Sequence, residues 1–102
     1  METALSLNKN LFEIEFKGKP LDLTPREYDL LAVLMQESQR VVGRAELLRR
    51  VWVESKPLIR VVDTYVCRLR AKLQGAGHPG IGVARKRGYH LIASSNESSV
   101  SI

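Results

Sequence analysis

The residues best suited to chemistry lie in one basic stretch, residues 60–73 (RVVDTYVCRLRAKL). At about 100° per residue, its apolar side chains fall at helical spacing and form one stripe that must pack on a core. The stripe comprises Val62, Val66, Leu69 and Leu73, and the opposite face carries Arg60, Thr64, Cys67, Arg68 and Ala71, with Arg70 and Lys72 on the flanks. Small uncharged side chains between the charges allow that face to approach a phosphate-lined groove closely. A solvated surface helix would have the same pattern, so the rest of the chain must decide.

The positive charge of the chain is concentrated in this part of the sequence. The formal net charge is +5. Between Arg60 and His90 there are seven basic residues and one acidic residue, Asp63, whereas the other segments carry nine bases and ten acids. Such an asymmetry predicts a polyanionic partner, of which nucleic acid is the commonest. A membrane surface fits less well, because no amphipathic stretch has the face rich in Trp, Phe and Leu that this mode prefers.

Other chemistries find little support in the sequence. His78 and His90 have no second histidine or cysteine at ligand spacing, whereas a zinc site needs about four ligands. Cys67 has no nearby histidine to activate it as a nucleophile, and the glycines of residues 75–82 are not followed by the GK[ST] of a phosphate loop. Asp63 is more naturally the partner of an arginine within the chain than a catalytic acid. We therefore predict no enzymatic activity, no metal site and no cofactor.

Length and composition describe one domain with a modest core. The chain has 102 residues, of which 44% are hydrophobic, an ordinary fraction for a globular protein. No apolar run approaches the roughly 18 residues of a membrane span, and no signal peptide opens the chain. A single cysteine excludes an internal disulfide and fits a reducing compartment, so we expect a cytoplasmic protein without a membrane partner. The polar composition of residues 94–102 predicts a flexible tail after a domain that covers residues 1–93.

A small antiparallel sheet should precede the helices. Residues 11–16 alternate, with Phe12, Ile14 and Phe16 on one face, which is typical of a half-buried strand. A turn follows at residues 17–18, and the alternation resumes at residues 21–23. Because proline has no N–H to donate, Pro20 predicts an edge strand or a strand that begins after it.

Three helices and a hairpin should follow. Thr24 is an expected N-cap, with Pro25 at the first helical position and Glu27 completing a capping box, for a helix that runs to about Gln36. Its expected buried side is formed by Tyr28, Leu31, Leu34 and Met35, with Leu30 at the margin. A second helix begins near Arg44 and should bury Leu47, Leu48, Val51 and Trp52. The basic helix, about residues 61–74, should end with Gly75 as its cap, and a hairpin with a basic tip should join residues 81–85 to residues 88–93.

This order of elements, with a basic third helix and a basic hairpin, is that of a winged helix-turn-helix, and several motifs carry a family resemblance. Residues 23–31 (LTPREYDLL) resemble the LTxxExxLL opening of the DNA-binding effector domain of OmpR/PhoB-type response regulators. Residues 44–48 (RAELL) with residues 51–52 (VW) are similar to its second helix. Residues 60–73 match its RxVDxxxxxLRxKL recognition helix, and residues 88–91 (GYHL) resemble its wing strand. The resemblance implies an α+β winged helix-turn-helix with a four-stranded N-terminal sheet, three helices and a C-terminal wing.

The resemblance also implies a partner and a role for each candidate residue. The partner is double-stranded DNA, with the third helix in the major groove and the wing, about residues 84–88, at the minor groove. Arg68 is the expected base reader, and Thr64, Tyr65 and Cys67 face the same groove. Arg60, Arg70 and Lys72 are expected to contact phosphates or to orient the helix. Arg85 matches the family's wing arginine, but Lys86 stands where the family often has glycine, which makes Lys86 and Arg87 possible substitutes.

Two further partners and one alternative function belong to this interpretation. Residues 53–60 match a loop that such proteins can present to RNA polymerase, and family analogy suggests a dimer on tandem half-sites. The alternative is a winged-helix module that binds an acidic protein or RNA. A protein-docking helix more often exposes apolar anchors, and RNA readers tend to display aromatic side chains. The outer side of residues 60–73 has no exposed apolar row, and aromatics make up 6% of the chain, which favours DNA.

Overall fold

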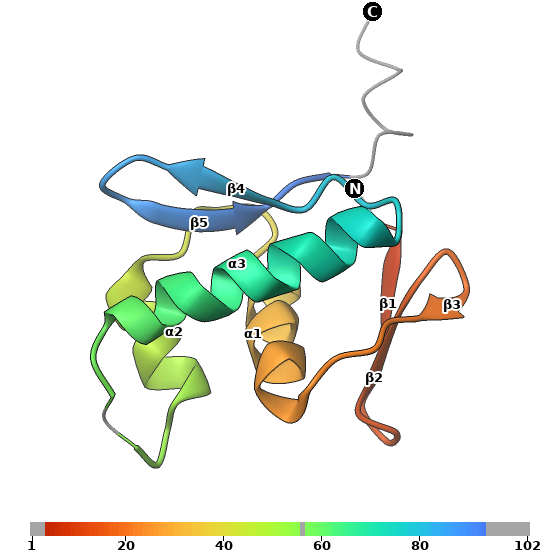
Figure 1. The fold of residues 1–102 in the computed structure, drawn as a ribbon, viewed down its shortest axis with the longest axis horizontal. Coiled ribbons are helices and arrows are strands. Elements are labelled where there is room, and N and C mark those ends of the chain that lie inside the picture. The colour runs from red at the N-terminus through yellow and green to blue at the C-terminus, as the bar shows by residue number, and fades with distance from the viewer. Residues whose placement is uncertain (1–3, 56, 94–102) are drawn as a thin grey trace, which may run out of the picture.

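The computed structural model describes residues 4–55 and 57–93. The predicted order of elements is confirmed, with a small sheet, three helices and a hairpin in an α+β arrangement (Figure 1). The expected flexible tail, residues 94–102, lies outside the described residues. The elements are β1 (Leu5–Asn8), β2 (Glu13–Phe16), β3 (Lys19–Pro20), α1 (Pro25–Gln36), α2 (Arg44–Val51), α3 (Arg60–Gly75), β4 (Ile81–Ala84) and β5 (Gly88–Leu91).

The N-terminal sheet has three strands among the described residues, not the four that the family resemblance implies. The strands are antiparallel in the order β1-β2-β3, so Pro20 lies on an edge, as predicted. β3 ends at Pro20, so the prediction that the strand alternation resumes at residues 21–23 was wrong; Leu21 N still donates to Ile14 O of β2 at 2.9 Å, and Leu23 N then donates to Leu21 O at 3.1 Å. The prediction that residues 11–16 form one alternating strand was wrong at its start, because Phe12 adopts a φ of 53° in a turn and is 74% exposed.

The start of α1 follows the predicted capping box. The Thr24 hydroxyl accepts from Glu27 N at 3.3 Å, and the Glu27 carboxylate accepts from Thr24 N at 2.9 Å. These bonds satisfy two backbone donors that the first turn of a helix leaves unpaired. The predicted buried side needs two corrections: Leu30, expected at the margin, is fully buried, and Met35, expected to be buried, is only half-buried. α1 packs against α2, α3 and β5, so a helix in this central place buries more than one stripe.

The core lies where the three helices meet the hairpin. The predicted stripe of α3 is confirmed, since Val62, Val66, Leu69 and Leu73 are at most 1% exposed. From α2 and the residue after it, Leu47, Val51 and Trp52 join the same core, while Leu48 is half-buried at its margin. Burial of one such aliphatic side chain stabilises a fold by about 1.5–3 kcal/mol, so the stripe fixes which side of α3 faces outward.

The glycine that ends α3 is not the one that we predicted. Gly75 is still helical, and the left-handed residue that terminates the helix is Gly77, with a φ of 99°. His78 N donates to Leu73 O at 2.9 Å and Gly77 N donates to Gln74 O at 3.0 Å, the pair of bonds of a Schellman motif. This turn directs the chain back along α3 into β4.

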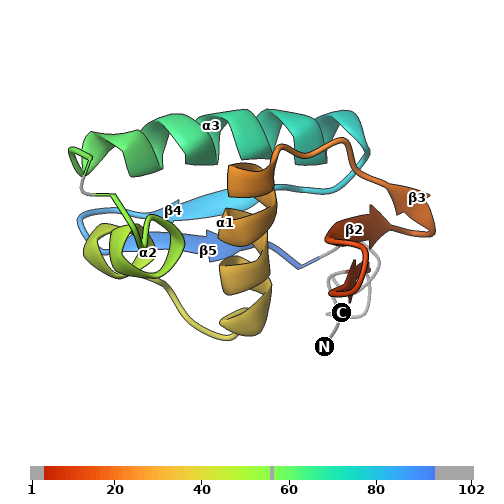
Figure 2. The ribbon, with the colours of Figure 1, turned by 90° about the horizontal axis from the view of Figure 1, so that it is seen from below.

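The hairpin of β4 and β5 with its connecting residues 85–87 is called the wing below. Its strands pair from Ile81 with Leu91 to Ala84 with Gly88. Val42, between α1 and α2, exchanges two backbone hydrogen bonds with Tyr89 of β5, so the wing is tied to the helical body as well as to itself. Gly88 has no room for a Cβ, which would collide with the Val42 carbonyl. Figure 2 shows α3 along one side of the molecule, with α1, α2 and the wing all on its other side.

Candidate nucleic-acid interface

The outer face of α3, defined by Arg60, Thr64, Cys67 and Arg68, is exposed along the helix. All four side chains are exposed, and none of the helices and strands that the structure describes covers this side of α3 in Figure 2. Tyr65, which we expected on the same face, is half-buried, with its ring against Trp52. The guanidinium carbon of Arg68 lies 5.1 Å from the centroid of the Tyr65 ring. The outer face is therefore polar, with one arginine held over an aromatic ring.

Asp63 joins α3 to both of its neighbours in the interface. Its Oδ2 accepts from Arg44 of α2 at 2.9 Å, and its Oδ1 accepts from the Tyr89 hydroxyl of β5 at 2.6 Å. The prediction that Asp63 pairs with an arginine of the chain is confirmed. Partial burial, together with the hydrogen bond to Asp63, raises the pKa of Tyr89 to about 12, so the hydroxyl keeps its proton and donates. This one acid fixes the wing beside the first turn of α3.

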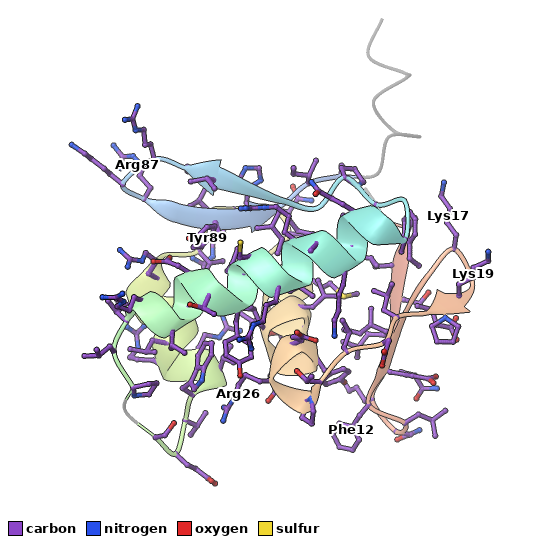
Figure 3. All side chains as sticks on the ribbon, viewed as in Figure 1. Phe12, Lys17, Lys19, Arg26, Arg87 and Tyr89 are labelled. Atoms are coloured by element: carbon purple, nitrogen blue, oxygen red, sulfur yellow. The ribbon has the colours of Figure 1, made fainter. Side chains whose placement is uncertain are left out.

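The tip of the wing carries three exposed cations. Arg85, Lys86 and Arg87 connect β4 to β5, and Arg87 N donates to Ala84 O at 2.8 Å to close the turn. Lys86 adopts a φ of 64°, the left-handed region that glycine enters most readily, at the position where the family often has glycine. Figure 3 shows Arg87 projecting from the end of the hairpin away from the helices. The lysine therefore adopts a backbone conformation that glycine would also allow, and it adds a charge.

A hollow of about 440 Å³ lies between α3 and the wing. Its walls combine cations from two elements with the hydrogen-bonded pair of Asp63 and Tyr89. The residues that line it are Arg44, Asp63, Val83, Ala84, Lys86, Arg87, Gly88 and Tyr89. Because the hollow is open and positively charged, the outer face of α3 and the wing form one continuous surface on which an extended polyanion can lie.

Arg70 and Lys72 make intramolecular contacts instead of facing outward with the other candidates. Arg70 Nε donates to Ile81 O at 3.1 Å and so holds the start of β4 against α3. Lys72 Nζ donates to Asp22 O and to Glu27 Oε1, both at 2.7 Å. Of the two roles expected for these residues, phosphate contact or helix orientation, this geometry supports orientation.

The Lys72 contact also explains how α1 tolerates a buried acid, Glu27, in its first turn. The Glu27 side chain is only 3% exposed. Burial alone would raise its pKa, but the hydrogen bonds from Lys72 and from the Thr24 backbone outweigh burial and hold the pKa of Glu27 below its usual value. An ionised, satisfied carboxylate therefore joins α1 to the end of α3.

The segment before α3 exposes three large aliphatic side chains, those of Val53, Leu58 and Ile59. Val53 is 72% exposed and Leu58 is 75% exposed, and Ile59 is the N-cap of α3. Arg60 belongs to the first turn of the helix and not to the loop in which residues 53–60 were grouped. Residues 53–55 and 57–59 thus present large aliphatic side chains beside the basic surface.

Sequence reasoning missed Arg44 and Tyr89, because their roles depend on Asp63 across gaps of 19 and 26 residues. The available signal was that Asp63 is the one acid in the basic part of the sequence. Within residues 4–55 and 57–93, no three His, Cys, Asp or Glu side chains gather to hold a metal ion. In the same part of the chain, no helix is both long and apolar enough to cross a membrane.

The chain matches the family described as "Transcriptional regulatory protein, C terminal" over residues 18–91. The chain belongs to this family. The resemblance to OmpR/PhoB-type effector domains, and the winged-helix fold that it implies, are thereby confirmed. Among curated relatives, the protein RcaC of Microchaete diplosiphon is 43% identical over 96 residues, which are 91% of this chain and 15% of RcaC. CpxR of Escherichia coli is 37% identical over 95 residues, 90% of this chain and 41% of CpxR. The chain thus spans less than half the length of either relative.

Two solved DNA-binding domains superpose on the chain over nearly their whole length. The DNA-binding domain of E. coli CpxR is 34% identical, with a TM-score of 0.75 over 92% of this chain and 95% of that domain. The DNA-binding domain of the response regulator AdeR, solved in complex with an intercistronic region, is 26% identical. Its TM-score is 0.82 over 91% of this chain and 98% of the AdeR domain.

Proposed function

We propose that this domain binds double-stranded DNA in a sequence-specific manner and serves a transcriptional regulator. In this proposal α3 lies in the major groove and the wing reaches an adjacent minor groove. The observation that carries the proposal is the single basic surface formed by the outer face of α3 and the wing. Asp63 of α3 is hydrogen-bonded to Tyr89 of the wing and to Arg44 of α2, which holds α3 and the wing side by side so that a duplex can contact both at once.

Each exposed residue takes a role that its position allows. Arg68 is exposed near the middle of α3 and reads a base, since a guanidinium can pair with guanine O6 and N7 together. Thr64 and Cys67 lie beside it and contact base edges or methyl groups, whereas Arg60, at the start of α3, contacts a phosphate. Arg85, Lys86 and Arg87 line the minor groove or its phosphates. Tyr65, Arg70 and Lys72 serve the interface by holding other groups in place.

The alternative partners, an acidic protein or RNA, are not favoured. The domain belongs to a transcriptional regulatory family, and a related DNA-binding domain at 26% identity was solved with an intercistronic region. The outer face of α3 also offers no row of apolar anchors for a protein groove. We propose a binding module without catalytic activity, cofactor or metal.

Relatives described as response regulators extend the proposal to the protein as a whole. We propose that the domain is the effector part of such a regulator, in the cytoplasm, and that two copies occupy tandem half-sites. The exposed side chains of Val53 and Leu58 fit a contact with RNA polymerase through residues 53–60.

Selection of a site from random duplexes tests the proposed function. The purified chain is used to enrich a duplex, and its dissociation constant is then compared for that duplex, a scrambled duplex and the same sequence as RNA. We expect the selected duplex to bind tightest, on the order of 10³-fold over the scrambled duplex for a complete site. Equal binding to all three, or a preference for RNA, would contradict the proposal.

A further inference from the structure

Four side chains from three parts of the helical body form a continuous stack that ends at Arg68. The guanidinium carbon of Arg26, in the first turn of α1, lies 5.3 Å from the centroid of the Trp52 ring. The Trp52 ring meets the Tyr65 ring edge to face, with centroids 5.4 Å apart and planes at 75°. The Tyr65 ring in turn lies under the guanidinium of Arg68, at 5.1 Å. These four residues, Arg26, Trp52, Tyr65 and Arg68, are called the stack below.

The inner end of the stack is fixed by the fold. Arg26 Nη1 donates to Val51 O at 2.6 Å, and Val51 is the last residue of α2. That carbonyl is one of those that a helix end leaves without an intrahelical partner, so the bond holds Arg26 where it covers Trp52. Trp52 is only 6% exposed and belongs to the core. Figure 3 places Arg26 on the side of the helices away from the wing tip and Arg87.

The outer end of the stack is a surface group of the interface. Arg68 is exposed, and Tyr65 precedes it by three residues, the spacing at which side chains on one helix meet. A free arginine side chain samples many rotamers and loses that freedom when it pairs with a base. An aromatic ring beneath the guanidinium removes part of this cost before binding. The guanidinium has five N–H donors, and its attraction to the ring uses its charge, so donors remain available to pair with a base.

We propose that Tyr65 is a positioning residue for Arg68, and that the stack sets the direction from which Arg68 meets its base pair. The inference rests on the proposed base-reading role of Arg68. Tyr65 acts through its ring and through Arg68, not through a contact of its own with DNA. The recognition of one base pair therefore depends on the packing of α1 and the end of α2 beneath α3.

The experiment that tests the role of Tyr65 measures discrimination, which is the ratio of affinities for the selected duplex and for a duplex changed at one base pair. Arg68→Lys first identifies the base pair whose discrimination depends on the guanidinium. Tyr65→Leu removes the ring, and we expect discrimination at that same base pair to fall roughly threefold to tenfold. Discrimination at the other base pairs should hold. Tyr65→Phe keeps the ring without the hydroxyl and should restore the value of the unmodified chain.

A double-mutant cycle separates positioning from direct contact. If Tyr65 acts through Arg68, then Tyr65→Leu has no further effect on discrimination once Arg68→Ala is present. A full effect of Tyr65→Leu in the Arg68→Ala background would overturn the inference, because Tyr65 would then touch DNA itself. Unchanged or increased discrimination in Tyr65→Leu alone would also overturn the inference, because the ring would then not help Arg68 to recognise its base pair.

The controls distinguish this inference from the proposed function and from a folding defect. If Arg68→Lys loses affinity equally on all duplexes, the proposed base-reading role of Arg68 is wrong. If Arg68→Lys loses discrimination at one base pair but Tyr65→Leu does not lose it at that base pair, only the positioning role of Tyr65 is wrong. Phe12→Leu removes a similar edge-to-face pair with Tyr28, at 5.7 Å, and should leave discrimination unchanged. Thermal melting checks that each variant folds, and Tyr65→Met, which offers a longer and more adaptable side chain, replaces Tyr65→Leu if that variant does not.

Discussion

Two groups of arginines in this small domain differ in what surrounds them. At the junction of α1 and α2, Arg40 and Arg50 each bind both Glu37 and Glu46 at 2.7–3.1 Å. On the outer face of α3 and on the wing, Arg60, Arg68 and Arg85 form no ion pair with any acid of the part of the chain that the structure describes.

The difference shows in the pKa values of the acids. Hydrogen bonds from Arg40 and Arg50 lower the pKa of Glu46 to about 2 and also lower that of Glu37. The charges at the junction are therefore neutralised within the chain, although the groups lie at the surface. The charges of the outer face and the wing are left for a partner. Whether a basic residue is already paired within the chain, and not the number of basic residues, is therefore our reason for proposing that the outer face of α3 and the wing meet DNA.

The largest test of this comparison removes the unpaired charges of the wing. Replacing Arg85, Lys86 and Arg87 together by alanine should weaken duplex binding by several kcal/mol, roughly 1 for each charge that meets DNA. The salt slope should fall by about 0.9 for each phosphate that the variant no longer touches. Titrations at four salt concentrations measure both quantities.

The matched control for the wing variant is Arg40→Ala with Arg50→Ala, which removes charge from the paired group. This control should lower the melting temperature, because the ion pairs with Glu37 and Glu46 are broken, while the salt slope stays the same. A fall of the salt slope by the same amount for each charge removed in the two variants would mean that net charge alone matters.

A second test concerns Lys72, which lies in the basic part of the sequence but is already paired with Glu27 in the folded chain. Lys72→Met leaves the buried Glu27 carboxylate without the Lys72 ammonium that pairs with it, so the free energy of unfolding should fall by about 2 kcal/mol. This is less than the cost for a fully buried pair, because the Lys72 side chain is 36% exposed. Chemical denaturation measures the change, and the salt slope of DNA binding should not move. A slope lowered by about 0.9 would instead make Lys72 a phosphate contact.

The same pair predicts a pH dependence. Because the pKa of Glu27 is lower in the folded chain, its contribution to stability is present above the ordinary value of 4.5 and is lost as the pH falls through the folded pKa. Lys72→Met should weaken this acid-side loss, since the hydrogen bond from Lys72 is the largest cause that lowers the pKa. Denaturation curves from about pH 3 to about pH 6, the range around an ordinary carboxyl pKa, compare the two proteins.

Tyr89→Phe tests the link between the wing and α3. The variant keeps the ring and removes the hydrogen bond to Asp63, which should cost about 1–2 kcal/mol of stability because one partner is charged. The pKa of Tyr89 is raised to about 12 from 10.0, so its contribution is complete below pH 10.0 and is lost as the pH rises toward 12. The unmodified chain should therefore lose stability over this alkaline window, and Tyr89→Phe should not. An equal loss of stability in the two proteins over this alkaline window would contradict the proposed role of the hydrogen bond between Tyr89 and Asp63.

How far the sequence predicts this molecule depends on the range of the contacts involved. The capping box of Thr24 and Glu27 spans three residues, and the stripe of α3 follows one helical period, so both could be predicted from local patterns. The exposure of Phe12 depends on a left-handed turn that alternation does not reveal. The full burial of Leu30 depends on α1 being covered from three directions, which no single-helix pattern predicts.

The site follows the same rule. Which residues lie on the outer face of α3 could be predicted, because burial of one stripe decides it. The inward contact of Lys72, on the flank of the helix, could not be predicted, because its partner Glu27 is 45 residues away. The stack behind Arg68 likewise joins residues of separate helices, and only the folded chain brings Arg26, Trp52 and Tyr65 together.

The smallest expected effect is at the tip of the wing. Lys86→Gly relieves a left-handed backbone that lysine adopts with strain, so stability should rise by about 0.5–1 kcal/mol. The same change removes one unpaired charge and should lower the salt slope by about 0.9 if Lys86 contacts phosphate. Lys86→Ala is the control, since it removes the charge and keeps the strain. A loss of stability in Lys86→Gly would contradict the strain assigned to this turn.

The central claim is that Arg68 reads a base pair, and its direct test is the binding of Arg68→Lys and Arg68→Ala to the selected duplex and to every single-base-pair variant of it. Arg68→Lys keeps the charge but cannot pair with guanine in the bidentate geometry, so we expect a loss of about 1–3 kcal/mol of discrimination at one position and little change elsewhere. Arg68→Ala should lose the same discrimination together with some affinity, while the melting temperature hardly moves because the side chain is exposed. If Arg68→Lys binds nearly as well as the unmodified chain and Arg68→Ala loses affinity equally on every duplex, then Arg68 contacts a phosphate, which would contradict the claim.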